Sequence, residues 1–148
     1  MGDPIGIRAL VPHDTLLRAL RNAQMARELS FAFMLRLGEK DTGLSVNFDQ
    51  TPAECQAGFN CTYGVASLTV QGVTGLELQV VPDEPHHANI TGIPYKEDDP
   101  VRAEFLASQL AKQAVLVSTT KVDNRARGLA FYRRLKFSYF TRIASARC

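Results

Sequence analysis

Two histidines lie beside two carboxylates in the middle of the chain. Asp83 and Glu84 precede Pro85, and His86 and His87 follow it. Imidazole and carboxylate together can bind a divalent metal or supply the acid and base of a catalytic site. The spacing fits no common metal pattern, and adjacent strand residues point to opposite faces of a sheet. We therefore predict no metal site. Structural hydrogen bonding of the histidines is the favoured interpretation, and His86, His87 and Glu84 are the candidates for a catalytic role.

A second set of polar residues is dispersed along the chain. Arg18 comes early, Ser45 lies in the strand-like segment 44–46, and an acid follows later at Glu77 or Glu84. This order resembles that of ADP-ribosyltransferases. The resemblance implies an arginine that binds a phosphate, a serine that shapes the nicotinamide pocket, and a glutamate that stabilises an oxocarbenium-like sugar. It adds Arg18 and Ser45 to the candidate catalytic residues.

The cysteines predict no disulfide framework. Cys55, Cys61 and Cys148 are few, odd in number and outside C-x-x-C spacing. We expect Cys55 and Cys61 to be reduced and unreactive. The first ten residues lack the apolar core of a signal peptide, and no apolar run has the roughly 18 residues of a membrane span. These observations predict a cytoplasmic protein without a membrane partner.

Charge is divided unevenly along the chain. Residues 121–148 hold eight Lys/Arg and one acid, a net charge of +7, whereas the rest holds nine basic and fourteen acidic residues, a net charge of −5. Aromatic residues are interleaved with the arginines of this tail. Such a segment suits phosphate pairing and base stacking, so nucleic acid is one possible partner. The favoured alternative is an amphipathic helix over 124–135 that packs on the core with its arginines in solvent. The arginines available to nucleic acid are Arg125, Arg127, Arg133 and Arg134.

The tail also resembles one end of an enzyme family. Residues 131–137 are similar to the aromatic-rich helix end of the GNAT acetyltransferases. Lys136 stands where that family has glycine, and no Gly-rich pyrophosphate loop occurs upstream. We therefore predict no coenzyme A site and no other cofactor.

Two helix starts are the clearest local signals. Thr51-Pro52-Ala53-Glu54 combines a capping box with proline at the first helical position, and predicts a short helix that ends at Gly58. Asp99-Pro100 predicts a longer helix whose buried stripe includes Ala103, Leu106 and Leu110, widened by Phe105. Residues 12–20 form either a helix start or a turn into a strand. Strands are expected at 31–35, 44–48, 64–70, 76–81, 86–93 and 115–117, with a loop at 82–85.

This order of elements favours an α+β fold with a single mixed or antiparallel sheet covered by two or three helices. Residues 12–117 also resemble a group of small uncharacterised bacterial proteins, a resemblance that implies no activity. It is carried by Pro12, Asp14, Leu17, residues 31–33, 44–46 and 51–54, Gly64, Val65, residues 87–90, Gly92, Ala107, Leu110 and Ala111. We expect a core domain over 1–120 and a basic, helical appendage over 121–148.

The sequence contains no coherent catalytic set, so our first hypothesis is a non-enzymatic interaction or regulatory domain. Its partner would be another protein or a second copy of the chain, and its gene would belong to a mobile or defence-type locus. The alternative is a small enzyme with an ADP-ribosyltransferase-like pocket or a polar pocket that contains histidine. Convergence of Arg18, Ser45 and an acid in one cleft would favour the enzyme.

Overall fold

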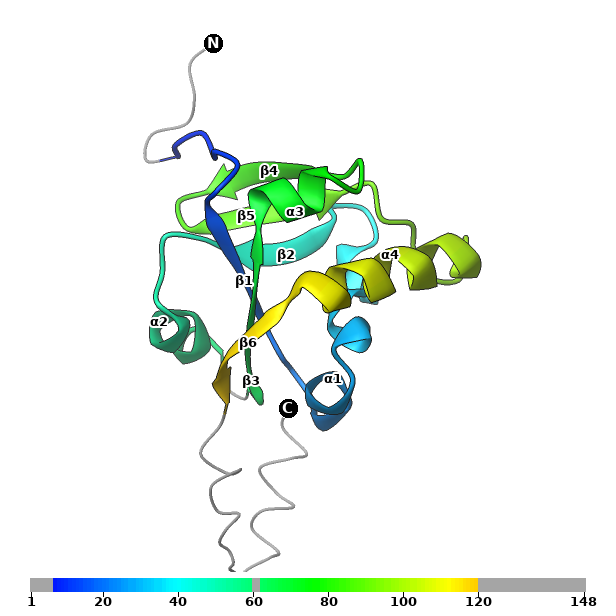
Figure 1. Cartoon of the computed structure of the whole chain (residues 1–148), viewed down its shortest axis with the longest axis horizontal. Coiled ribbons are helices and arrows are strands. Elements are labelled where there is room, and N and C mark those ends of the chain that lie inside the picture. Colours follow the sequence, from blue (N-terminus) through cyan, green and yellow to red (C-terminus); the bar gives the residue numbers. More distant parts are fainter. Residues whose placement is uncertain (1–6, 60–61, 120–148) are drawn as a thin grey trace, which may run out of the picture.

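The computed structural model describes residues 7–59 and 62–119, which form an α+β fold around one six-stranded sheet (Figure 1). The strand order is β4-β5-β2-β1-β3-β6, and every neighbouring pair is antiparallel. The predicted α+β class is confirmed, and the sheet is the antiparallel one of the two types expected. The strands are β1 (Thr15–Ala19), β2 (Leu44–Asn47), β3 (Gly64–Thr69), β4 (Gln79–Glu84), β5 (His87–Thr91) and β6 (Val115–Thr119).

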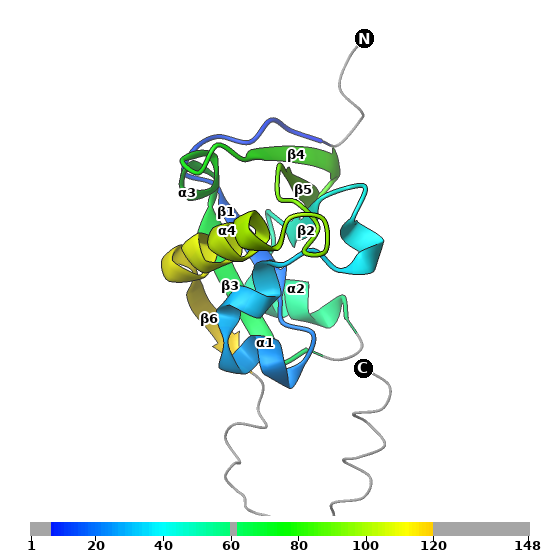
Figure 2. The ribbon, with the colours of Figure 1, turned by 90° about the vertical axis from the view of Figure 1, so that its right-hand side faces the viewer.

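Helices cover one face of this sheet and part of the other. In Figure 2, α4 runs across one face of the sheet, and the main core lies between the two. Phe33, Leu106 and Leu110 are among its fully buried side chains. On the opposite face, α2 packs against β1 and β3, and a smaller cluster forms there around Cys55 and Val65. The helices are α1 (Ala23–Arg27), η1 (Leu29–Phe33, 3₁₀), η2 (Leu37–Glu39, 3₁₀), α2 (Pro52–Ala57), α3 (Val70–Thr74) and α4 (Pro100–Gln113).

The β4–β5–β2 part of the second face remains open. Leu44 and Val46 of β2 and Ala88 and Ile90 of β5 point into the main core, as period-2 alternation requires. Their neighbours along the strands are polar and half-buried on the other face. The open half of the sheet therefore presents a row of polar side chains to solvent.

Both predicted helix starts are confirmed. Thr51 accepts a hydrogen bond from the Glu54 N–H at 3.1 Å, and the Glu54 carboxylate accepts the Thr51 N–H at 2.8 Å. Asp99 accepts from the Arg102 N–H at 3.2 Å. These signals succeed because a capping interaction lies within four residues and needs no tertiary partner. Phe105 was predicted wrongly, since its side chain is 54% exposed.

The apolar run at 31–35 is buried, but it is not the expected strand. Residues Leu29–Phe33 form η1, and the chain then continues in extended conformation through Met34. A short, fully apolar segment has no periodicity that distinguishes a buried strand from a buried helix. Packing of η1 against α4 and α1 decides the conformation here.

The region after β3 also differs from the prediction. Thr69 ends the strand and caps α3 by accepting from the Gly72 N–H at 3.0 Å, so β4 begins only at Gln79. Residues 82–84, expected in a loop, extend β4. Pro82 is tolerated because β4 is an edge strand, and a bulge between Pro82 and Glu84 absorbs the irregularity.

Several predictions fall on residues outside those described. They concern Cys61, Cys148 and the whole basic tail, including its expected helix over 124–135 and its four arginines. Cys55 is free and buried, and burial raises the pKa of its thiol. A raised pKa lowers the thiolate fraction, so Cys55 has the properties of a packing residue.

Candidate functional site

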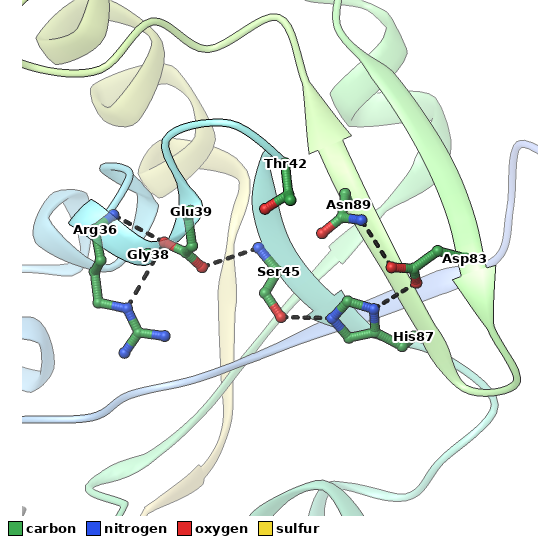
Figure 3. Close-up of a pocket in the computed structure, with 8 residues that line it drawn as sticks. All are labelled: Arg36, Gly38, Glu39, Thr42, Ser45, Asp83, His87 and Asn89. Carbon is green, nitrogen blue, oxygen red and sulfur yellow. Dashed lines mark hydrogen bonds and ion pairs between the residues drawn. The ribbon is translucent and has the colours of Figure 1, made fainter.

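The open face of the sheet brings a serine, a histidine and an aspartate into one chain of hydrogen bonds (Figure 3). Ser45 Oγ lies 2.7 Å from His87 Nε2, and His87 Nδ1 lies 2.6 Å from Asp83 Oδ1. An ionised carboxylate can only accept, so the proton of the neutral imidazole belongs on Nδ1. The Nε2 lone pair then accepts from the Ser45 hydroxyl. This is the order of nucleophile, base and orienting acid in a Ser-His-Asp triad.

Three adjacent strands position these groups. Ser45 pairs with Asn89 across β2 and β5, and His87 lies two residues along β5 on the same face, within diagonal reach of Ser45. At the β4 bulge, Asp83 and Glu84 together oppose His87, which turns Asp83 towards the imidazole. Asn89 donates its amide N–H to the other Asp83 oxygen at 3.0 Å. The carboxylate is thereby held by two neighbours on β5.

The backbone of Ser45 is held from the core side by a buried ion pair. Arg18 Nη1 lies 2.6 Å from Glu39 Oε2, and both side chains are almost fully buried. Glu39 Oε2 accepts the Ser45 N–H at 3.0 Å, and Arg18 Nη1 donates to the Ser45 carbonyl at 2.8 Å. Strands β1 and β2 are joined only by the Leu17–Asn47 pair, so the Ser45 N–H and carbonyl have no partner on β1. The side chains of Glu39 and Arg18 take the place of that partner.

The ion pair is completed by two more backbone contacts. Arg18 Nε donates to the Ala32 carbonyl at 2.7 Å, and Glu39 Oε1 accepts the Arg36 N–H at 2.9 Å. Burial raises the pKa of the Glu39 carboxyl, but hydrogen bonds from Arg18, Arg36 and Ser45 outweigh burial and hold that pKa below its usual value. Glu39 is therefore a permanent acceptor for the Ser45 N–H near neutral pH.

A glycine allows the close approach of β2 to β5 just before Ser45. Gly43 has φ of +115°, and a Cβ there would lie 2.7 Å from the Ile90 carbonyl oxygen. Any larger residue would need both a strained backbone and a displaced β5. Gly43 therefore helps to bring Ser45 to the level of His87.

The triad lines an open pocket of about 540 Å³. Arg36 contributes the pocket's cation. Its Nε lies 3.7 Å from Glu39 Oε1, and its side chain is 42% exposed. Within the described residues its guanidinium makes no hydrogen bond and no closer ion pair, so it is available to a ligand. The lining residues are Arg36, Gly38, Glu39, Thr42, Ser45, Asp83, His87 and Asn89.

The pocket unites only two of the five candidate residues proposed from the sequence, Ser45 and His87. His86 occupies the hairpin turn with φ of +73°, and its Nδ1 contacts the Phe48 carbonyl at 3.2 Å. Glu84 is exposed and does not line the pocket. Arg18 binds Glu39 and two carbonyls in the core, so it cannot offer its guanidinium to a substrate phosphate. The arrangement therefore gives no support to an ADP-ribosyltransferase-like role for Arg18.

Four residues of the site were not proposed as site residues from the sequence: Asp83, Asn89, Glu39 and Arg36. Alternation along β5 does place Asn89 on the same face as His87, so that residue could have been found. The sequence shows Asp83 next to the histidines but indicates no role for it. The bulge in β4 decides that Asp83 faces His87, and alternation along the strand does not predict a bulge. Glu39 and Arg36 lie in a turn whose path no periodic pattern predicts.

The described residues hold no group of three or more His, Cys, Asp or Glu side chains arranged for a metal ion. Among these same residues, no helix is long and apolar enough to cross a membrane. The chain matches no known family model, no curated protein and no solved structure. The site geometry therefore carries the functional argument alone.

Proposed function

We propose that this protein is a small serine hydrolase, with Ser45 as nucleophile, His87 as general base and Asp83 as the residue that orients His87. One observation carries the proposal: the continuous chain Ser45 Oγ, His87 Nε2, His87 Nδ1 and Asp83 Oδ1, with contacts of 2.7 and 2.6 Å in an open pocket. Both distances are within the reach that proton transfer requires.

The expected reaction is transfer of an acyl group from an ester to water. His87 Nε2 takes the Ser45 hydroxyl proton while Oγ attacks the carbonyl carbon, and the carbonyl electrons form an oxyanion. The intermediate collapses with cleavage of the ester C–O bond, and His87 returns the proton to the leaving oxygen. Water then attacks the acyl-Ser45 ester by the same route, which releases the acid and restores the hydroxyl.

Arg36 is the residue that we assign to the oxyanion. Among the residues that the structure describes, it is the only Lys or Arg that lines the pocket. Glu39 competes for it little because Glu39 is bound more closely by Arg18. A positioned cation stabilises charge that develops in the transition state. Removal of one such donor typically costs about 10²–10³-fold in rate.

Covalent labelling and ester hydrolysis test the proposal. A fluorophosphonate probe should label Ser45, as located by mass spectrometry, and 4-nitrophenyl butyrate should be hydrolysed. Ser45→Ala should abolish labelling, and His87→Gln should reduce both labelling and turnover by about 10²–10⁴-fold. Ser67→Ala is the matched serine control. Ser67 pairs with Leu17, and Leu17 pairs with Asn47, so Ser67 lies on the same face of the sheet as Ser45. It has no histidine partner among its described contacts. His86→Asn is the matched histidine control.

Both control variants should retain wild-type labelling and turnover. If Ser45 remains unlabelled while the protein is folded, or if Ser67→Ala lowers the rate as much as Ser45→Ala, the proposal is wrong.

A second candidate function, the non-enzymatic interaction domain, is favoured by the edge strand β6. Its side chains Val115, Leu116 and Val117 are 58%, 44% and 40% exposed at the end of the sheet. Apolar edge strands tend to pair with another strand, and the occupant that we propose is β6 of a second copy of this chain. Sedimentation velocity should then give a dimer that Val117→Lys converts to monomer. A wild-type monomer at all concentrations would refute this function.

A further inference from the structure

A second hollow adjoins the Ser45 pocket, and Arg36 lines both. This hollow, which we call the Tyr95 groove, has a volume of about 270 Å³. The turn through η2 separates the two, with Gly38 and Glu39 on the Ser45 side and Leu37 on the other. The groove is lined by Phe31, Met34, Leu35, Arg36, Leu37, Tyr95, Lys96 and Glu97.

Most residues that line the Tyr95 groove are apolar in type. Five of its eight lining residues are Phe, Met, Leu or Tyr, and Leu37 is 73% exposed within it. Apolar side chains held open beside a polar pocket are typical of a ligand site with an apolar body and a polar anchor. Arg36 suits the boundary because its stem is apolar and its head is cationic.

Cations outnumber acids among the residues that line the groove. Arg36 and Lys96 line the groove, and Lys40 Nζ lies 5.2 Å from the centroid of the Tyr95 ring. Glu97 is the one acid of the groove lining among the described residues. Glu39 is compensated by Arg18, so its charge does not cancel that of Arg36. An apolar occupant that carries a negative charge therefore matches the groove better than a neutral or cationic one.

We infer that the substrate is an ester with an aliphatic group that ends in, or carries, a carboxylate. The aliphatic group lies on Leu37, Met34 and Tyr95, and the carboxylate pairs with Lys96, which leaves Arg36 for the oxyanion. The inference rests on the proposed function only for the position of the reacting carbonyl beside Ser45. Occupation of the groove by an aliphatic carboxylate can be measured without any turnover.

The test is calorimetric titration of full-length Ser45→Ala protein with acetate, butyrate, hexanoate and octanoate. Affinity should rise by up to about fourfold per added methylene, as burial of a CH₂ group predicts. Octylammonium, with the same chain length and the opposite charge, should bind at least tenfold more weakly than octanoate. Equal binding of the two octyl compounds, or affinity that is independent of chain length, would overturn the inference.

Two pairs of variants locate the binding in the groove. Leu37→Ser should weaken octanoate about tenfold, while Val101→Ser, at a similarly exposed position on α4, should not. Lys96→Gln should weaken octanoate but not 1-octanol, while Lys112→Gln near the end of α4 should change neither. Octanoate affinity that is unchanged by both Leu37→Ser and Lys96→Gln would also overturn the inference.

The two proposals can fail separately. Chain-length-dependent octanoate binding in a protein whose Ser45 resists the fluorophosphonate probe supports the groove and refutes the hydrolase. A labelled Ser45 in a protein that binds octanoate no better than acetate supports the hydrolase and refutes the groove.

Discussion

The two sides of Ser45 are held by carboxylate networks of opposite character. On the core side, Glu39 is 5% exposed and bound by Arg18 and by the backbone N–H groups of Arg36 and Ser45. On the open side, the side chain of Asp83 is 43% exposed and bound by His87 and Asn89. Water therefore screens the second network much more than the first. We therefore expect the core network to contribute chiefly to stability and the open network chiefly to chemistry.

The largest effect should follow from breaking the core network. Glu39→Gln leaves the Arg18 guanidinium buried without its counter-charge and should lower the free energy of unfolding by about 3–5 kcal/mol, measured by urea titration. The double variant Arg18→Met/Glu39→Leu should recover only part of this loss, because the Ser45 and Ala32 backbone groups remain unsatisfied. A loss below about 0.5 kcal/mol in Glu39→Gln would contradict the assigned role.

The same network predicts how stability depends on pH. The pKa of Glu39 is lower in the folded protein than its usual value of 4.5, so the folded state favours the ionised form. This contribution is fully present above pH 4.5 and is lost as pH falls through the lowered folded pKa. The free energy of unfolding should therefore fall more steeply below pH 4.5 in the wild type than in Glu39→Gln. Parallel pH profiles would show that Glu39 does not carry the acid sensitivity.

A smaller change in stability should accompany a break in the open network. Asp83→Asn should alter the free energy of unfolding by less than about 1 kcal/mol, because the Asp83 charge is well solvated. Its rate of ester hydrolysis should fall about 10- to 100-fold, less than the roughly 10⁴-fold of a buried triad aspartate. Urea titration and steady-state kinetics on one preparation give both numbers. A large loss of stability without a loss of rate would show that the Asp83 network contributes to stability rather than to chemistry.

The smallest effect is expected at a third cluster of charged side chains, in which Arg8 and Asp49 are each 43% exposed and Asp14 is 15% exposed. Arg8 binds Asp14 and Asp49 at 2.8 Å each. Hydrogen bonds from Arg8 and from the Val11 N–H hold the pKa of Asp14 down at about 2. Salt screens such exposed pairs, so Arg8→Gln should lower the free energy of unfolding less than Glu39→Gln does at low ionic strength, and less still in about 0.5 M NaCl. Urea titration at two salt concentrations measures this. A salt-independent loss would show that contact of Arg8 with Phe48, rather than charge, dominates.

Sequence reasoning succeeded where the interaction that determines a structure is local. Thr51, Pro52 and Glu54 determine where α2 begins, and Asp99 does the same for α4, because a cap and its partner lie within one helical turn. Alternation likewise identified β2, and the strand expected at 86–93 contains β5. Sequence reasoning failed at 31–35 and at Pro82, where burial beside α4 and a position at the sheet edge override local preference.

The sequence by itself determined the residue types of the site and the strands that carry Ser45 and His87. Tertiary structure alone decided that Ser45 Oγ meets His87 Nε2 across 42 residues of chain, because strand register depends on side chains packed on both faces. It also decided that Arg18, a candidate phosphate ligand from its order in the chain, instead supports the backbone of Ser45. The reason is physical: β1 separates from β2 after one residue pair, and the backbone groups exposed by that separation must be satisfied inside the core.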